Sequence, residues 1–439
     1  MVSPCSYDHG QFEAGGGPLM HRQENFLRLE TTTPQNQRVC DEPRLRQAMQ
    51  QNGIDLIVAR SKTNVGYLTG HFTSTWHWDS AILHFMQMEY EGWDYVVYGG
   101  FPADPDKDIF LLEYNHRLEA VSRQGTWADV VYGYYRGGKY RPSETRCTNF
   151  EPSWQKTATD VLVQAILESG YERGRIGIEL NQVSHSVFDR LRNALPHVEW
   201  VDVWDLLLRI RAIKTPEEIR RLREAFQVAT QVYEAVIPSI RPGDTPRSIF
   251  LRQLQEIYSR GGTFLANHIC FASPDIADSP PPDKPIEAGQ IGTFDLCIAT
   301  QDYQTDYGRV VCLGCPPDGF REVYDIVMQA MEWAIGRVEP GRRAADLFWE
   351  CTHFLEKYNL CFAMGFCGHG TGLDVHEYPF INPHSEDQFE IGMTPVLEFY
   401  LELKEYGCFL VENCGIVTEN GFENLCTFPY RELMVIPVS

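Results

Sequence analysis

The alternation of apolar and polar positions divides the chain into an irregular start and two regions of regular structure. The first 39 residues are rich in Gly, Pro and polar side chains, and we expect an N-terminal arm over residues 1–39. From Pro43 onward, apolar positions at helical spacing alternate with short apolar runs such as residues 54–58, which are typical of buried strands. This alternation reaches about Trp204 and predicts an α/β N-terminal domain over residues 40–211.

A second domain is predicted over residues 212–439 because a strong helix signal opens there. Thr215 can cap a helix whose first residue is Pro216, and Glu218 completes a capping box. The apolar positions that follow form one stripe at helical spacing: Ile219, Leu222, Phe226, Ala229, Tyr233 and Val236. This pattern predicts a long amphipathic helix.

The second domain also repeats its own pattern. One helix is expected to end at the Pro-Gly pair of residues 242–243, and another at the Pro-Gly pair 98 positions later, residues 340–341. Each pair precedes a further helical stretch and then two strands that carry acidic residues. The shared order of elements indicates an internal duplication, with the acidic residues on its pseudo-twofold axis.

Composition limits the class of protein. A chain of 439 residues is too long for one compact core, and 38 Lys plus Arg against 60 Asp plus Glu give a net charge of −22. That charge argues against nucleic acid or an acidic membrane as a partner and favours a small or cationic ligand. Without a secretory pattern or a run of eighteen apolar residues, we expect a cytoplasmic protein whose 13 cysteines are reduced thiols.

Four acidic residues interrupt otherwise apolar, strand-like runs: Asp295, Asp306, Glu398 and Glu412. Around the first of them, period-2 geometry places Phe294 and Leu296 on one face of a strand and Asp295 on the other. A buried carboxylate without a partner is costly, so a single such residue is usually salt-bridged or half exposed. Four of them in two strand pairs favour a site for hard metal ions.

A glycine-rich segment, Gly-His-Gly-Thr-Gly at residues 368–372, supplies an imidazole. The flanking glycines let the backbone approach other segments closely, and we expect them to expose His369. His376 lies seven positions further on and can face a substrate. A lone His is more often structural than a ligand, but this glycine context favours a metal ligand. The sequence therefore predicts an all-protein cage for two cations and an activated water.

Several segments resemble one superfamily. The runs DLCIATQDYQTD, GHGTGLDVHEYP, GMTPVLEFY and CFLVENCGIVTENG resemble the four motifs of the creatinase, prolidase, aminopeptidase P and methionine aminopeptidase superfamily, which has the pita-bread fold. RIRAIKTPEEIRRLREA resembles the entry helix of its catalytic domain, and RLRQAMQQNGIDLIVARSKTNVGYLTG resembles its creatinase-type N-terminal domain. The resemblance covers roughly residues 40–430 and implies an α/β protein with a pseudo-twofold, α+β catalytic domain.

The resemblance implies a dinuclear metal centre. Its ligands would be Asp295, Asp306, His369, Glu398 and Glu412, with Asp306 and Glu412 bridging two divalent ions. Acidic oxygen ligands favour manganese, iron, cobalt or zinc over copper. Glu398 would move the proton of a metal-activated water, and His376 would contact the substrate or transfer a proton.

The N-terminal domain is also expected to contribute to the site. In relatives, the loop after its first strand and helix reaches toward the active site, often that of the partner subunit. Here this loop carries Trp76 and Trp78, which share one side of an extended chain and would form a wall for a cationic or apolar substrate group. Interface or core packing is the competing interpretation. The resemblance further implies a homodimer.

The chain departs from the peptidases of this superfamily at two places. They carry one His in a loop before the first Asp and another just before the metal-binding His, whereas residues 275–282 and 364–366 contain none. His268 is expected in the core or behind a ligand. Hydrolysis of a C–N bond in a small peptide or amide therefore has two alternatives, a lyase of the dimethylsulfoniopropionate type and a metal-free binding module.

Three cysteines stand two positions from candidate ligands. Cys297 and Cys414 share a strand face with the nearby acid, and Cys367 precedes His369. They either line the metal site or pack beneath it as small buried residues. Packing is the favoured interpretation because Cys is often fully buried.

Overall fold

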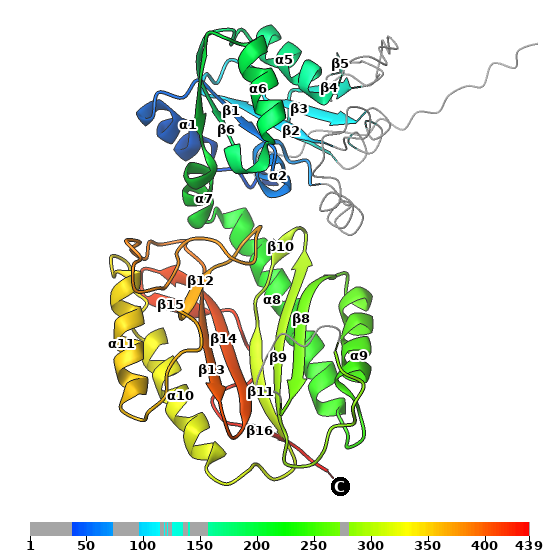
Figure 1. Cartoon of the computed structure of the whole chain (residues 1–439), viewed down its shortest axis with the longest axis vertical. Helices are drawn as coiled ribbons and strands as arrows, with labels where there is room; N and C mark the ends of the chain where they lie inside the picture. Colours follow the sequence, from blue (N-terminus) through cyan, green and yellow to red (C-terminus); the bar gives the residue numbers. More distant parts are fainter. Residues whose placement is uncertain are drawn as a thin grey trace, which may run out of the picture.

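Two domains, joined through a short helix, make up the protein (Figure 1). The computed structural model describes residues 37–72, 96–114, 118, 121, 125–134, 139–140, 157–272 and 281–438. Most of the predicted N-terminal arm, and both Trp76 and Trp78, lie outside the described residues.

The N-terminal domain is built on a mixed sheet. Within the described residues, seven strands follow the order β5-β4-β3-β2-β1-β6-β7, and β1 pairs antiparallel with β2 but parallel with β6. The strands are β1 (Leu56–Ala59), β2 (Tyr98–Pro102), β3 (Phe110–Tyr114), β4 (Val130–Tyr134), β5 (Lys139–Tyr140), β6 (Gly174–Ile178) and β7 (Val198–Asp202). The helices are α1 (Glu42–Gln51), α2 (Lys62–Thr69), α5 (Ala158–Glu168) and α6 (His185–Ala194), with a 3₁₀ turn at Leu180–Gln182. The predicted α/β class is confirmed.

Helix α8 (Pro216–Val236) opens the second domain as its sequence predicted. The Thr215 hydroxyl accepts the Glu218 backbone N–H, and the Glu218 carboxylate accepts that of Thr215, which completes the capping box. The predicted stripe is buried from Leu222 to Val236, while Ile219 is partly buried. Helix α7 (Trp204–Ala212), which connects the two domains, was not predicted.

The second domain repeats one order of elements. Its first half contains α8, a 3₁₀ turn at Ile237–Ser239, α9 (Pro246–Ser259), β8 (Thr263–Phe271), β9 (Ile291–Thr300), β10 (Tyr303–Gln304) and β11 (Gly308–Leu313). Its second half contains α10 (Phe320–Ile335), α11 (Ala344–Glu356), β12 (Gly368–Gly370), β13 (Pro395–Leu403) and β14 (Gly407–Thr418), followed by β15 (Gly421–Asn424) and β16 (Met434–Ile436). Two helices and then antiparallel strands occur in each half, which agrees with the predicted duplication.

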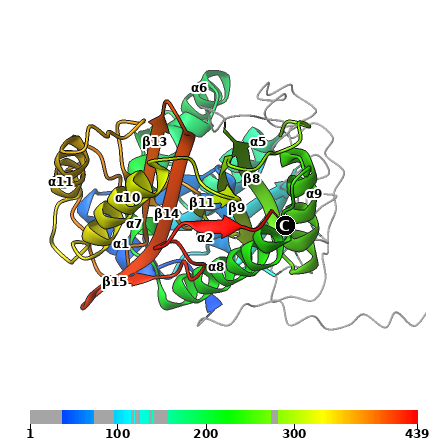
Figure 2. The same ribbon diagram turned by 90° about the horizontal axis from the view of Figure 1, so that it is seen from below.

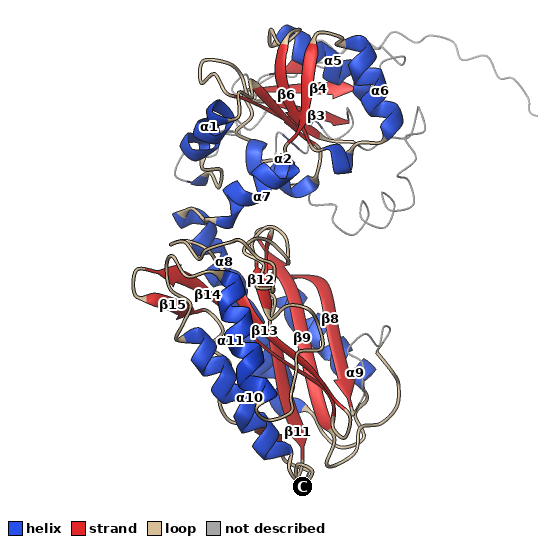
Figure 3. Cartoon of the chain, turned by 60° about the vertical axis from the view of Figure 1, so that its left-hand side comes forward, coloured by secondary structure: helices blue, strands red, loops and turns tan. Residues whose placement is uncertain are grey.

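The strands of the two halves lie side by side, and the helices cover their outer faces. In Figures 1 and 3, α8 and α9 flank β8 and β9, whereas α10 and α11 flank β13 and β14. The view from below shows β14 next to β11 and β9 (Figure 2), and these strands are in contact. One apolar cluster extends from the N-terminal domain into the first half around Phe226 and Phe294, and another fills the second half around Tyr324 and Phe399. The inner strands between these cores carry the acidic residues.

Candidate metal centre

The four carboxylates and the imidazole predicted as metal ligands come together from both halves of the second domain. Glu398 on β13 and Glu412 on β14 are direct cross-strand partners. Asp295 lies on β9, opposite Gly308 of the adjacent β11, and Asp306 stands just before β11. His369 is the central residue of β12, which pairs with β13. Residues up to 117 positions apart in the chain thus converge on one place.

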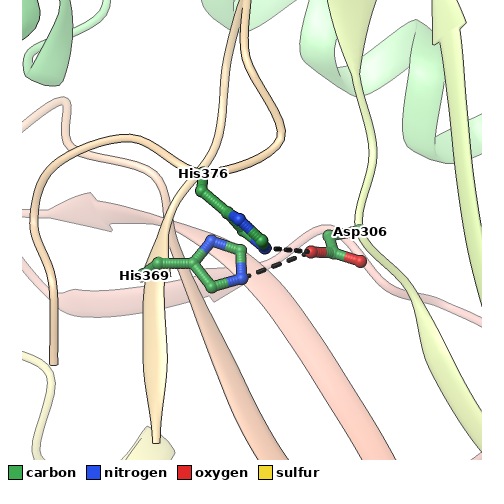
Figure 4. Close-up of side chains that lie close together, drawn as sticks. All are labelled: Asp306, His369 and His376. Carbon is green, nitrogen blue, oxygen red and sulfur yellow. Dashed lines mark ion pairs between the residues drawn. The ribbon is translucent and has the colours of Figure 1, made fainter. Parts of the chain in front are cut away.

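Asp306 lies at the centre of this cluster. The Nε2 atom of His369 is 3.2 Å from Asp306 Oδ2 and 3.4 Å from Glu398 Oε2. Figure 4 shows the rings of His369 and His376 both directed at the Asp306 carboxylate. The other ring nitrogen of His369, Nδ1, lies 2.9 Å from the Gly370 carbonyl oxygen, so it donates there and Nε2 is left to act as a ligand.

The cluster fits divalent metal ions. Asp306, His369, Glu398 and Glu412 are at most 8% exposed, and the Asp295 side chain is 13% exposed. Among the described residues, the buried Glu412 Oε2 has no hydrogen-bond partner. Burying several carboxylates without opposite charge is costly, and a single imidazole cannot neutralise four of them. Carboxylate oxygens with one imidazole nitrogen are a donor set that suits first-row divalent ions.

Burial and mutual repulsion control protonation within the cluster. Burial first, and then the carboxylates of Asp306 and Glu398, raise the pKa of Asp295 well above its usual value. Burial and the carboxylates of Asp306 and Asp295 do the same to the pKa of Glu412. Burial alone would lower the pKa of His369, but Asp306 and Glu398 raise it to about 10. Burial also opposes ionisation of Asp306, yet the contact with His369 holds its pKa below the usual value. Without metal, protons therefore provide the missing positive charge.

We expect the metal-free protein to lose stability as the pH rises from 6.5 to about 10. The folded-state pKa of His369 is above its unfolded value, so its stabilising effect is complete below pH 6.5 and is lost as the pH rises through about 10. The raised pKa values of Asp295 and Glu412 act in the same direction. Divalent ions replace these protons, so the increase in Tm on adding metal should grow across this window. Thermal melts of the metal-free and metal-loaded protein test this, and a metal-free Tm that rises with pH would contradict it.

Glycines around His369 allow close backbone contacts, as predicted, but they do not expose its ring. A Cβ atom on Gly370 would lie 2.1 Å from the Tyr378 carbonyl oxygen, and one on Gly368 would lie 2.2 Å from that of Val396. His369 itself is 1% exposed, so the predicted exposure is wrong. The ring is instead held by a hydrogen bond from Nδ1 to the Gly370 carbonyl and by contacts with the rings of Phe366 and His376.

Gly308 is a further residue of the site that sequence reasoning missed. A Cβ atom there would lie 2.9 Å from Glu412 Cγ, because β14 crosses β11 at this point. Its place two residues after Asp306 was the available signal. Gly308 thus leaves room for the Glu412 side chain to reach Asp306.

His376 lies at the open edge of the cluster. Its side chain is 60% exposed, its Nε2 is 3.7 Å from Asp306 Oδ2, and its ring centroid is 4.2 Å from that of His369. Partial burial, and then His369, lower the pKa of His376, which favours the neutral imidazole. Phe366 packs its ring edge-to-face with that of His369, at 6.4 Å between the ring centroids. The His369 ring therefore has the hydrogen-bonding ring of His376 and the apolar ring of Phe366 as neighbours.

His268 lies behind Asp295 rather than in the core. It is the cross-strand partner of Asp295, its Nε2 is 4.0 Å from Asp295 Oδ2, and its side chain is 33% exposed. Of the two expectations from sequence, a position behind a ligand is the one that the structure supports.

A buried ion cluster holds the loop between His369 and His376, and sequence reasoning missed it. Arg211, at the end of α7, forms ion pairs with Asp374, at 2.7 Å, and with Glu377. Lys214 Nζ lies 3.0 Å from the second carboxylate oxygen of Glu377. Burial alone would raise the pKa of Glu377, but Arg211 and Lys214 lower it to about 2. The available signal was a pair of basic residues within the otherwise apolar run 210–214.

The same arginine connects this loop to the N-terminal domain. Arg211 Nη1 donates to Asn64 Oδ1 at 2.8 Å, and Asn64 Nδ2 donates to Glu179 Oε1 at 2.6 Å. Arg211, Asn64 and Glu179 are fully or almost fully buried. Buried hydrogen bonds and ion pairs thus connect the N-terminal domain to the loop that carries His376.

Two family models match the chain. The model of the creatinase/prolidase N-terminal domain matches residues 43–213, and that of metallopeptidase family M24 matches residues 220–419. The Xaa-Pro dipeptidase of Pyrococcus furiosus is 28% identical over 263 residues, which are 59% of this chain and 75% of that protein. The ectoine hydrolase of Halomonas elongata is 25% identical over 421 residues, which are 89% of this chain and 95% of that protein. The X-Pro aminopeptidase of Thermotoga maritima has the same fold, with a TM-score of 0.71 at 20% identity over 90% of this chain and 99% of that one.

The fold and the donor cluster together define a metal-dependent hydrolase with a pita-bread catalytic domain. The chain belongs to the creatinase, prolidase, aminopeptidase P and methionine aminopeptidase superfamily, as its motifs predicted. Membership of a metallopeptidase family implies divalent metal ions, and the donors described above fit them. Within the described ranges, no helix combines the length and the apolar character needed to cross a membrane.

Proposed function

We propose that this protein hydrolyses the C–N bond of an Xaa-Pro-like dipeptide or of a small amide. The observation that carries the proposal is the buried acidic cluster around Asp306. Among the described residues, Glu412 Oε2 has no hydrogen-bond partner there, and the exposed His376 borders the cluster. The proposed ligands of two divalent ions are Asp295, Asp306, His369, Glu398 and Glu412. Manganese, iron, cobalt and zinc are the candidates for these ions.

The residues of the site have separable tasks in such a reaction. When bound, the two ions would supply an acidified water and polarise the scissile carbonyl. Glu398, which lies 3.4 Å from His369 Nε2 and is 8% exposed, would accept the water proton and pass it to the leaving nitrogen. His376 is a neutral N–H donor at the edge of the cluster and would hydrogen-bond the developing oxyanion.

The substrate class is proposed from chemistry at the edge of the site and from relatives. Phe366 offers an apolar face beside His369, which suits a compact ring or aliphatic group next to the scissile bond. The Pyrococcus relative is an Xaa-Pro dipeptidase, and the Halomonas relative hydrolyses ectoine. A proline-like ring and a small cyclic amide are therefore the first substrates to test.

The assembly and location of the protein are proposals as well. We propose a homodimer in the cytoplasm, in which Trp76 and Trp78 form part of the substrate wall. The proposed domain limits are an arm over residues 1–39, a domain over 40–211 and a catalytic domain over 212–439. The two matched family models, over residues 43–213 and 220–419, support this division.

Metal analysis and a substrate panel test the proposal together. Protein purified without chelator should contain two metal equivalents. It should also release proline from Xaa-Pro dipeptides or open the ring of a small cyclic amide. Asp306→Ala should bind no metal and hydrolyse none of these substrates. Release of dimethyl sulfide from dimethylsulfoniopropionate, without amide hydrolysis, would replace the proposal by a lyase. Absence of metal and turnover in the wild type would leave a binding module.

A further inference from the structure

Cys297 lies on the same face of β9 as Asp295 and stands among the candidate metal ligands. Its Sγ atom is 3.3 Å from Asp306 Oδ1 and 3.7 Å from Asp295 Oδ1. One donor atom from each of these three residues lies within 4.8 Å of the other two, and Cys297 is 5% exposed. The thiol therefore contacts the carboxylate groups directly and is not separated from them as a packing residue would be.

The two other cysteines near ligands differ from Cys297. Cys367 is fully buried in the apolar cluster of the second half, where its thiol contacts that of Cys351. Cys414 is also fully buried in an apolar cluster, and its backbone N–H donates to Cys426 Sγ at 3.2 Å. The packing interpretation fits these two thiols. It does not account for a sulfur atom that faces two carboxylates.

The distances around Cys297 match those between two ligands of one ion. With metal–sulfur and metal–oxygen bonds of about 2.3 Å and 2.1 Å, the two donors lie about 3.1 Å apart at a right angle and about 3.6 Å apart at a tetrahedral angle. The observed separations are 3.3 Å and 3.7 Å. One shared cation accounts for both contacts at once. Independently, the buried Glu412 Oε2 has no hydrogen-bond partner among the described residues, and a cation in the same cluster would supply a partner.

We propose that Cys297 is a sixth protein ligand of this centre, a thiolate on the ion that Asp295 and Asp306 hold. The inference rests on the metal centre proposed above. Coordination breaks the S–H bond and forms a metal–sulfur bond; the proton leaves to solvent, and no electrons are transferred. Because thiolate is a softer donor than carboxylate, the site prefers zinc, cobalt or iron over manganese.

Cobalt substitution tests this ligand by spectroscopy, without an activity assay. Metal-free protein is loaded with Co²⁺, metal content is measured, and the absorption spectrum is recorded. The wild type should show an intense near-ultraviolet band from sulfur-to-cobalt charge transfer. Cys297→Ser should still bind cobalt but lose this band, and its preference for cobalt over manganese should fall by about tenfold or more. Cys414→Ser, also two positions from a ligand, is the matched control and should keep the band.

The possible outcomes distinguish a failure of the Cys297 ligand from a failure of the proposed metal centre. Full uptake of cobalt by the wild type without the charge-transfer band overturns the role of Cys297 and leaves the proposed hydrolase intact. A band that persists in Cys297→Ser has the same consequence. Absence of cobalt uptake by the wild type overturns the metal centre and the thiolate ligand together. The wild-type spectrum alone can refute the thiolate ligand, so the test remains valid even if the serine variant folds poorly.

Discussion

Replacing Glu412 by Gln is expected to remove most of the bound metal and almost all activity while the protein stays folded. Glu412 is 1% exposed, faces Glu398 across the strand pair and leaves Oε2 without a partner in the described part of the chain. An amide cannot supply the negative charge that two adjacent cations require. Because loss of an outer hydrogen-bond partner alone costs about 10- to 100-fold in metal affinity, loss of the proposed ligand Glu412 should cost more than about 100-fold.

Stability measurements distinguish this loss of metal from loss of the fold. Ligand at about 100 times its Kd stabilises a protein by about 2.7 kcal/mol, so the wild type should show a clear increase in Tm on adding metal. Glu412→Gln should lose that increase. Its metal-free Tm should equal or exceed that of the metal-free wild type, because one repelling carboxyl is gone from beside Asp306 and Asp295.

A matched control lies on the neighbouring strand. Glu402 is an exposed carboxylate on β13, so Glu402→Gln changes the same functional group without touching the cluster. Its metal content, kcat/KM and Tm should match those of the wild type. Retention of two metal equivalents by Glu412→Gln would contradict the proposed role of Glu412 as a ligand.

Local sequence patterns predicted those features of the fold that local physics determines. The Thr215–Glu218 capping box fixed the start of α8, and strand alternation placed Phe294 and Asp295 on opposite faces of β9. The apolar run at residues 54–58, expected as a strand, forms β1 over Leu56–Ala59 instead, since an apolar run does not define where hydrogen bonding to its neighbour starts. Element type was therefore more predictable than element limits.

The parts of the site that sequence could not provide depend on contacts between distant segments. The need for Gly308 arises because Glu412, 104 positions later, crosses it. The backbones of Tyr378 and Val396 approach the glycines that flank the buried His369, and no helical or strand period encodes these contacts. Similarly, one period-2 face contains both Asp295 and Cys297, but only the position of Asp306 places the thiol among the carboxylates. Motifs identified the donors, and tertiary packing determined their surroundings.

Arg211→Met is expected to lower kcat strongly while leaving metal content unchanged. Glu377 N–H donates to the Gly370 carbonyl and Gly370 N–H to that of Glu377, both at 2.8 Å, so these two residues close the loop that presents His376. The Glu377 side chain is anchored by Arg211 and Lys214, and all three are at most 5% exposed. Removing one partner of a buried ion pair costs about 3–5 kcal/mol, because the remaining charge stays buried. The loop should respond by moving, and His376 with it.

Kinetics of three variants separate positioning of His376 from general stability. Arg211→Met should reduce kcat more than it changes KM, and Arg211→Lys should recover part of kcat because a cation still faces Glu377. Arg209→Met, on the same helix but with a side chain 54% exposed, should behave as the wild type. If Arg211→Met lowered Tm and left kcat unchanged, the arginine would stabilise the domain contact without orienting His376. If the variant lost its metal as well, the effect of Arg211 would extend to His369.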